Sequence, residues 1–190
     1  MSYRVPYVKT LILGGSTFVG RRMVDLLVRE GHDVSVLNRG KTASDLPPGV
    51  ARIVGDRTDT ESMARALGGT SWDAVIDVSG FVMAAGGGEF EALLGLVDGN
   101  VGAYVFVSSI MAYEPSGVMP WLESAPQTKD PATTYGGVKA HAETAILDQR
   151  DQCDRRITQR RGEVGAAVVD APGPQVRPAA GDRGGGARVG

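Results

Sequence analysis

The chain has 190 residues, a formal net charge of −2 and a single cysteine. These values exclude a disulfide framework and a cysteine metal cluster, and the charge gives no support for nucleic-acid binding. The length is that of one ordinary domain. No apolar run approaches the length of a membrane span, and the N-terminal segment MSYRVPYVKT lacks the apolar core of a signal peptide. We therefore expect a protein of the reducing cytoplasm that is not bound to a membrane.

Short apolar runs alternate with amphipathic segments along the first 150 residues. Strands are predicted at VKTLIL (8–13), DVSVL (33–37), ARIV (51–54), DAVIDV (73–78) and AYVFVSS (103–109). Helices are predicted from FVGRRM to the stop at Gly31, and over 59–67, 89–97 and 131–147. Apolar strands that alternate with helices are typical of a parallel sheet covered on both faces. The predicted fold class is therefore α/β, with a Rossmann-like, doubly wound parallel sheet.

A glycine-rich loop follows the first strand, in the segment LGGSTFVG. In the dinucleotide fingerprint G-x-G-x-x-G, Gly15, Thr17 and Gly20 would occupy the three glycine positions, so the middle glycine is missing. The N-terminus of the following helix offers free N–H groups to a pyrophosphate, and the Thr17 hydroxyl can add a donor. The alternative is a plain strand-to-helix turn. The predicted cofactor contacts in this loop are Gly14, Gly15, Ser16, Thr17, Phe18 and Gly20.

The segment NRGK follows the second strand, where an acidic residue would hold the ribose hydroxyls of NAD. Here Asn38 is neutral, whereas Arg39 and Lys41 are cationic. A guanidinium pairs with a 2′-phosphate in a bidentate manner, so these residues favour NADP, with NAD as the alternative. Solvated charges on a surface turn would also explain them. Further cofactor contacts are predicted after the third strand at Asp56, which could meet the adenine, and after the fourth at Ser79 and Gly80, although a structural turn explains these equally well.

Tyr135 and Lys139 are four residues apart on a predicted helix, which places them on one face. Interconversion of a carbonyl and an alcohol needs a proton donor and acceptor, a group that polarises the oxygen, and a hydride carrier. A tyrosine beside a lysine ammonium can serve as the acid/base, and a serine at a strand end can bind the substrate oxygen. The lysine can also hold the nicotinamide ribose, so Tyr135 and Lys139 are predicted cofactor contacts as well. The serine candidates are Ser108 and Ser109. An exposed polar helix face is the alternative, with Tyr113 as the next candidate for proton transfer.

As a set, LILGGSTFVGR, NRGK, VGDR, WDAVIDVSGF, YVFVSSIMAY and YGGVKAHAE resemble the short-chain dehydrogenase/reductases, in their extended and atypical epimerase/dehydratase branches. The resemblance covers about residues 7 to 148. It implies that Tyr135 is the acid/base, that Lys139 assists it, and that Ser109, four residues before Tyr113, orients the substrate. It implies a small-molecule substrate with a carbonyl or hydroxyl group, and it is compatible with a homodimer. The segment AAGGGEFEALLGLVDGN departs from the asparagine-glycine-threonine pattern of enzymes that act on nucleotide sugars.

The last 40 residues differ from the rest of the chain. After Lys139 there is no further lysine, and arginine, glycine, alanine and proline become dense. We predict a dinucleotide-binding domain over 1–150 and an atypical tail over 151–190, with one strand near 165–171 and disorder elsewhere. Relatives are longer, so most of the substrate-binding part would be missing, through a truncated or frame-shifted gene or a natural flexible tail. The sequence thus leaves two functions open: an NAD(P)-dependent oxidoreductase or epimerase, and a non-catalytic NADP-binding module, for which RNA binding rests on family analogy alone.

Overall fold

The computed structural model describes residues 7–41, 45–79, 88–115 and 124–163. The chain divides into two compact units, Met1–Cys153 and Asp154–Gly190. The structure of the first unit is built from five strands and their connections. The strands are β1 (Lys9–Leu13), β2 (Asp33–Asn38), β3 (Ala51–Val54), β4 (Trp72–Asp77) and β5 (Val101–Phe106). The helices are α1 (Phe18–Arg29), α2 (Thr60–Leu67), α3 (Glu89–Val97), the short 3₁₀ helix η1 (Ile110–Ala112) and α4 (Tyr135–Glu163), which continues into the second unit.

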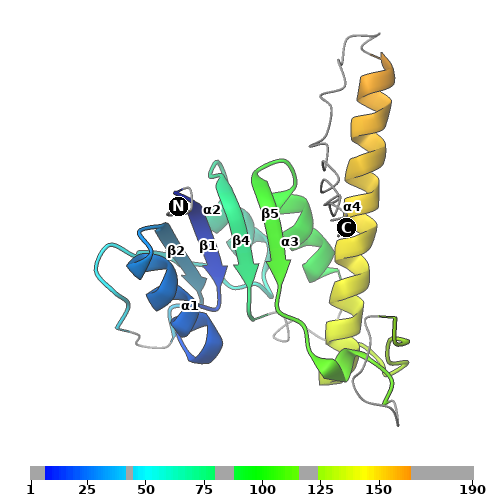
Figure 1. The fold of residues 1–190 in the computed structure, drawn as a ribbon, viewed down its shortest axis with the longest axis horizontal. Helices are drawn as coiled ribbons and strands as arrows, with labels where there is room; N and C mark the ends of the chain where they lie inside the picture. The colour runs from blue at the N-terminus through cyan, green and yellow to red at the C-terminus, as the bar shows by residue number, and fades with distance from the viewer. Residues whose placement is uncertain (1–6, 42–44, 80–87, 116–123, 164–190) are drawn as a thin grey trace, which may run out of the picture. The chain divides into compact units, whose positions relative to one another are not determined.

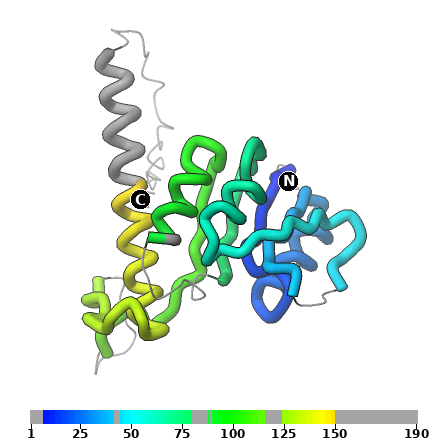
Figure 2. Tube along the Cα trace, turned by 180° about the vertical axis from the view of Figure 1, so that it is seen from behind, coloured from blue at the N-terminus to red at the C-terminus, as the bar shows by residue number. Residues whose placement is uncertain are grey.

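All five strands are parallel, in the order β3-β2-β1-β4-β5. The helix α1 covers one face, where Val24 packs with Ile12, Val34 and Val36 of the strands. Helices α2 and α3 cover the other face, as Figures 1 and 2 show from opposite sides. The reversal of strand order between β1 and β4 is the point at which doubly wound sheets bind ligands. The predicted α/β fold class is confirmed.

The core of the sheet lies between the strands and the helices α2 and α3. Leu11, Leu13, Leu37 and Val75 point from the strands toward this layer, and they pack there against Met63 and other side chains of the two helices. A third cluster joins the beginning of α4 to α3 and β5, through Phe90, Leu94, Ala142 and Ile146 together with Phe106. The first turns of α4 are therefore fixed against the end of the sheet that carries the candidate site.

Two predicted elements differ from the structure by more than two residues at one end or both. The fifth strand ends at Phe106 rather than at residue 109, so the two serines lie in the segment that leads from β5 into η1. The last helix starts at Tyr135 and continues to Glu163, well beyond the predicted end at 147 and into the segment predicted to be disordered apart from one strand. The predicted helix is too short because the apolar spacing that indicates it ends at Leu147. The residues from there up to 161 contain no glycine or proline, so nothing in them breaks a helix. The predicted strand near 165–171 lies outside the described residues.

Candidate dinucleotide and catalytic site

The glycine-rich loop closes tightly between β1 and α1. Gly14 adopts a φ of +94°, in the left-handed region that favours glycine. A Cβ built on Gly14 would lie 2.7 Å from the Cβ of Ser79, and one built on Gly20 would lie 2.4 Å from the Gly14 carbonyl oxygen. Both positions therefore need glycine. The loop brings the free N–H groups at the start of α1 to the carboxyl end of the sheet, where an anion can bind them.

Thr17 occupies the position of the missing middle glycine without distorting the loop. Its backbone is extended, with φ −142° and ψ 164°, which any residue can adopt, and it is the N-cap of α1. Its side chain makes no capping hydrogen bond, so the hydroxyl is not used to cap the helix. Phe18, the first residue of α1, has a φ of 49° and an almost fully exposed side chain. The residue of this loop with a strained backbone is thus Phe18. It follows Thr17, which stands in place of the middle glycine of the fingerprint.

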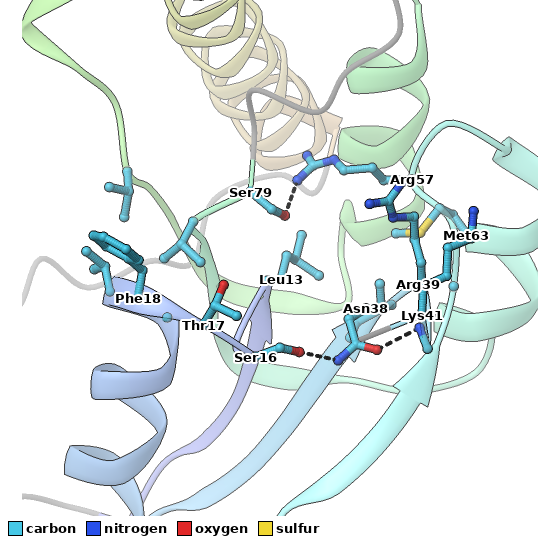
Figure 3. A pocket seen from close by; sticks show the side chains of 18 of the residues that line it. Leu13, Ser16, Thr17, Phe18, Asn38, Arg39, Lys41, Arg57, Met63 and Ser79 are labelled. Carbon is cyan, nitrogen blue, oxygen red and sulfur yellow. Dashed lines mark hydrogen bonds between the residues drawn. The ribbon is translucent and has the colours of Figure 1, made fainter. Parts of the chain in front are cut away.

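The turn after β2 is fixed by the side chain of Asn38. Its Nδ2 donates to Ser16 Oγ at 2.6 Å, and its Oδ1 accepts from the Gly40 backbone N–H at 2.9 Å. Asn38 therefore ties the phosphate loop to the turn that carries Arg39 and Lys41, both of which are exposed. Figure 3 shows the bond between Asn38 and Ser16 at the edge of the pocket. Because Asn38 holds this turn in place, the side chains of Arg39 and Lys41 can bind an anion here.

Asp56 lies after β3 and is held by its own turn. Its Oδ1 accepts from the Thr58 hydroxyl at 2.8 Å and from the Thr58 backbone N–H at 3.1 Å. These hydrogen bonds lower the pKa of Asp56, and the charges of Arg39 and Lys41 lower it further. The carboxylate is therefore ionised at neutral pH. It is not among the residues that line the pocket described below.

A buried ion pair lies below the end of β4. The Arg57 guanidinium donates through both terminal nitrogens to the two carboxylate oxygens of Asp77, at 2.8 Å each. Arg57 is 7% exposed and Asp77 is fully buried. Tyr104 of β5 donates its hydroxyl to the same carboxylate at 2.8 Å, and Arg57 also donates to Ser79 Oγ at 2.7 Å. Burial alone would lower the pKa of Arg57, but the hydrogen bonds and charge of Asp77 outweigh that effect and raise it. Arg57 therefore keeps its positive charge in this buried position.

Lys139 and Tyr135 lie on the first turns of α4, at the other end of the site. Lys139 Nζ donates to the Val107 carbonyl at 2.6 Å and lies 4.5 Å from the centre of the Phe106 ring and 5.9 Å from that of Tyr135. Lys139 is 2% exposed, whereas half of the Tyr135 surface is exposed. Burial lowers the pKa of Lys139, and the charge of Asp77 partly offsets this. The predicted pair thus shares one helix face, with the cation behind the phenol.

Glycines allow the start of α4 to pack this closely. A Cβ on Gly136 would lie 2.2 Å from the Met111 carbonyl oxygen, and one on Gly137 would lie 2.1 Å from the Pro131 carbonyl oxygen. Thr134 caps the helix, because its Oγ1 accepts from the Gly137 N–H at 3.1 Å. The sequence TYGGVK therefore contains both the cap and the two small residues that place Tyr135 against the segment after β5.

The two adjacent serines have different hydrogen-bond partners. Ser108 Oγ donates to Glu143 Oε1, on the turn of α4 after Lys139. Glu143 Oε2 also accepts from the Tyr113 hydroxyl at 3.2 Å and from Gln127 Nε2 at 2.9 Å. Ser109 Oγ accepts from the Met111 N–H at 3.2 Å and caps η1. The hydroxyl proton of Ser109 therefore remains for another acceptor, while that of Ser108 is committed to Glu143.

One pocket of about 460 Å³ joins these parts. It runs along the carboxyl ends of the strands, from the turn after β2, past the phosphate loop, to the start of α4; Figure 3 shows the part around the loop. The predicted site residues that line it are Gly14, Ser16, Thr17, Phe18, Gly20, Asn38, Arg39, Lys41, Ser79, Tyr135 and Lys139. Gly15 packs below the loop against Val36, Asp56 and Ser109 lie outside the lining, and Gly80 lies outside the described residues.

Sequence reasoning missed Arg57, Asp77 and the partners of Glu143. The signal for the ion pair was present in the strand WDAVID, since an aspartate that ends an apolar parallel strand needs a cation when it is buried. The arginine next to Asp56 was the available partner. The pairing itself could not be derived, because it depends on how the turn after β3 crosses to the end of β4.

The fold and the pocket define a Rossmann-like, dinucleotide-binding type of protein. The chain belongs to the NAD dependent epimerase/dehydratase family, whose sequence model matches residues 10–162. The resemblance to the short-chain dehydrogenase/reductases is thereby confirmed. Among the described residues, no helix is long and apolar enough to cross a membrane.

The similar proteins include a binding protein and enzymes. The chloroplast stem-loop binding protein of 41 kDa b of Arabidopsis thaliana is 28% identical over 142 residues, which are 68% of this chain and 36% of that protein. The 2'-dehydrokanamycin reductase of Streptomyces kanamyceticus is 30% identical over 166 residues, 87% of this chain and 45% of the reductase. The Bordetella bronchiseptica enzyme WbmG, solved in complex with NAD and UDP, superposes with a TM-score of 0.63 at 18% identity, over 75% of this chain and 50% of WbmG. The chain thus spans half or less of the length of each of these three proteins.

Proposed function

We propose that the protein binds NADP or NAD in this pocket and uses it to interconvert a carbonyl and an alcohol in a small-molecule substrate. The observation that supports this most strongly is the continuity of the pocket. It has a phosphate loop and a helix N-terminus at its middle, and Tyr135 with Lys139 at one end. A bound nicotinamide cofactor would supply or accept the hydride, and the protein would supply the proton.

Tyr135 is the proposed acid/base. Its half-exposed side chain can reach a substrate, while the buried Lys139 stands one helical turn behind it. The ammonium of Lys139 is held in place by the Val107 carbonyl, so its positive charge stabilises negative charge that develops on the phenol oxygen. Ser109 Oγ accepts from Met111 and keeps its hydroxyl proton for the substrate oxygen, although the serine that lines the pocket is its neighbour Ser108. These roles match the three requirements of carbonyl–alcohol chemistry.

The turn after β2 supports NADP as the preferred cofactor. Arg39 and Lys41 line the pocket, and no carboxylate is among the described lining residues at that end. Asp56 is nearby and ionised, but its turn holds it through Thr58. A 2′-phosphate would therefore meet two cations at the pocket wall, where NAD would present only hydroxyls to them.

The substrate class is a compound with a carbonyl or hydroxyl group, which includes nucleotide sugars. The relatives include the reductase compared above and a UDP-glucose 4-epimerase of Lactobacillus helveticus, which is 28% identical over 161 residues.

The experiment is a scan of sugar nucleotides, keto sugars and simple carbonyl compounds, in which the oxidation of NADPH is monitored. In an active combination, Tyr135→Phe should lose about 10²–10⁴-fold in rate while cofactor affinity stays unchanged. Undiminished turnover in this variant would move the proton transfer to another group, with Tyr113 tested next.

A non-catalytic NADP-binding module is the second candidate function. It is supported by one of the relatives compared above, which is named as a chloroplast stem-loop binding protein and not by a reaction. In that case the cofactor would bind with normal affinity, and no member of the substrate panel would be turned over. The two candidates share the cofactor site and differ only in the outcome of the scan.

A further inference from the structure

Arg57 is a pocket residue that lies outside the phosphate loop and the turn after β2, at the end of the segment VGDR. It lines the same pocket as the phosphate loop, although its side chain is only 7% exposed. Its guanidinium is fixed by two parallel bonds to Asp77 and extends to Ser79 Oγ (Figure 3). Such a bidentate pair holds a guanidinium in one orientation. The position of Ser79 is therefore set by a charged group that is itself rigid.

Two hydrogen bonds hold Ser79 in place, and its hydroxyl proton makes only one weak contact. Its backbone N–H donates to Asp77 Oδ1 at 3.0 Å, and its Oγ accepts from Arg57 at 2.7 Å. The hydroxyl donates to Asp77 Oδ1 with 3.5 Å between the two oxygens, which is at the outer limit for a hydrogen bond. Of these three interactions of Ser79, the weak one made by the hydroxyl proton is the easiest to replace with a hydrogen bond to a ligand.

The hydroxyl of Ser79 lies next to the phosphate loop. A Cβ on Gly14 would lie 2.7 Å from Ser79 Cβ and 3.1 Å from Ser79 Oγ. The loop and the helix N-terminus behind it form the part of the pocket that is suited to a diphosphate. An oxygen of that group would therefore lie within reach of both the loop N–H groups and the Ser79 hydroxyl.

We propose that Arg57 and Asp77 act as positioning residues that hold Ser79 as a hydrogen-bond donor to the cofactor diphosphate. This inference rests on the proposed cofactor site and adds the groups that organise its β4 side. Because Ser79 Oγ accepts from a cation, its own O–H is polarised and donates more strongly. The buried carboxylate of Asp77 keeps the guanidinium from turning into the pocket, so the arginine acts through the serine.

The test uses a variant that removes the ion pair without leaving a buried charge. In Arg57→Met combined with Asp77→Asn, the asparagine can still accept from the Ser79 N–H and pair with Tyr104. Arg65→Met combined with Glu61→Gln is the matched control, because that exposed pair on α2 carries the same charges outside the pocket. Ser79→Ala is made alone and in the double variant. Binding of ADP and of adenosine is measured by calorimetry, with thermal unfolding to establish the fold of each protein.

The double variant should fold and bind ADP about tenfold more weakly, while its affinity for adenosine, which has no phosphate, stays within about twofold of the unmodified protein. The control pair should change neither affinity. Ser79→Ala should weaken ADP to the same degree, and it should cause no further loss in the double variant, because both changes remove one interaction. Unchanged ADP affinity in the folded double variant, an equal loss for ADP and adenosine, or fully additive losses would each overturn the proposal.

Arg57→Lys provides a second test if the double variant does not fold. Lysine keeps a positive charge for Asp77 but cannot contact Asp77 and Ser79 with a rigid fork. The expected result is again a selective loss for ADP, and normal ADP affinity would overturn the proposal. An unmodified protein that binds NADPH, with no effect of any Arg57 variant, would refute this inference alone. An unmodified protein that binds no dinucleotide would refute the proposed function and this inference with it.

Discussion

Lys139 Nζ donates a hydrogen bond of 2.6 Å to the backbone carbonyl of Val107, which ties the first turns of α4 to the carboxyl end of β5. This bond places a lysine ammonium in a site with almost no exposure to water. The helix position that carries the candidate acid/base is therefore fixed by a buried charge. The energetic cost of burying this charge should make the stability of the protein depend on pH.

The stability of the protein should depend on pH through Lys139. Burial lowers the pKa of Lys139 in the folded state, so the unfolded chain binds this proton more tightly than the folded one. Stability rises with pH wherever the unfolded state holds more protons. Relative to Lys139→Met, the unmodified protein should therefore gain stability as the pH rises from neutral toward 10.5, the ordinary lysine value. Urea unfolding of both proteins at a series of pH values measures this, and a difference that falls or stays constant would contradict the assignment.

Cofactor preference should depend on Arg39. This guanidinium lines the pocket at the turn after β2, where a charge-assisted hydrogen bond to a 2′-phosphate is worth about 1.5–3 kcal/mol. Arg39→Ala should weaken NADPH by about tenfold or more and leave NADH nearly unchanged. Arg22→Ala is the control, because Arg22 is exposed on α1 and does not line the cofactor pocket. Equal affinities of the unmodified protein for the two cofactors would count against the assignment.

The phosphate loop should not tolerate a side chain at Gly20. A Cβ there would lie 2.4 Å from the Gly14 carbonyl oxygen, and backbone atoms must shift to relieve that contact. Gly20→Ala should therefore abolish measurable cofactor binding. Gly95→Ala is a matched change inside α3, where no atom lies within 4 Å, and it should stabilise the protein by about 0.5–1 kcal/mol. Normal binding in Gly20→Ala would show that the loop does not carry the cofactor.

The Glu143 carboxylate should stabilise the segment that carries the serines. It accepts from Ser108, Tyr113 and Gln127, which come from three positions outside α4. Glu143→Ala leaves partly buried donors without their acceptor, so the free energy of unfolding should fall by about 1–3 kcal/mol. Glu91→Ala removes only an exposed pair with His141 and should cost less than about 1 kcal/mol. Equal losses in the two variants would show that the cluster contributes no more than a surface contact.

Much of the fold follows from local patterns in the sequence. The runs that form β1 and β2 end in residues of the pocket, because parallel strands present their carboxyl ends at one edge of the sheet. The helix spacing of Tyr135 and Lys139 is likewise local and could be read directly. The length of α4 could not, since a polar segment without breakers is compatible with either helix or coil.

The groups that organise the site depend on tertiary contacts. Arg57 and Asp77 are 20 residues apart and meet only because the turn after β3 approaches the end of β4. In the same way, the resemblance favours Ser109 over Ser108 only by its spacing from Tyr113. The structure shows what distinguishes them, namely that Glu143 takes the proton of Ser108. Spacing along one chain segment predicts which residues share a face, but not which partner each one finds.

The central claim is that a dinucleotide binds in the pocket that joins the phosphate loop to Tyr135 and Lys139. Calorimetric titration of the unmodified protein with NADPH and NADH, beside Gly20→Ala, tests it most directly. We predict one site per chain, tighter binding of NADPH than of NADH, and no binding to the variant. Absence of binding by both cofactors to the unmodified, folded protein would contradict the claim, as would binding that Gly20→Ala leaves intact.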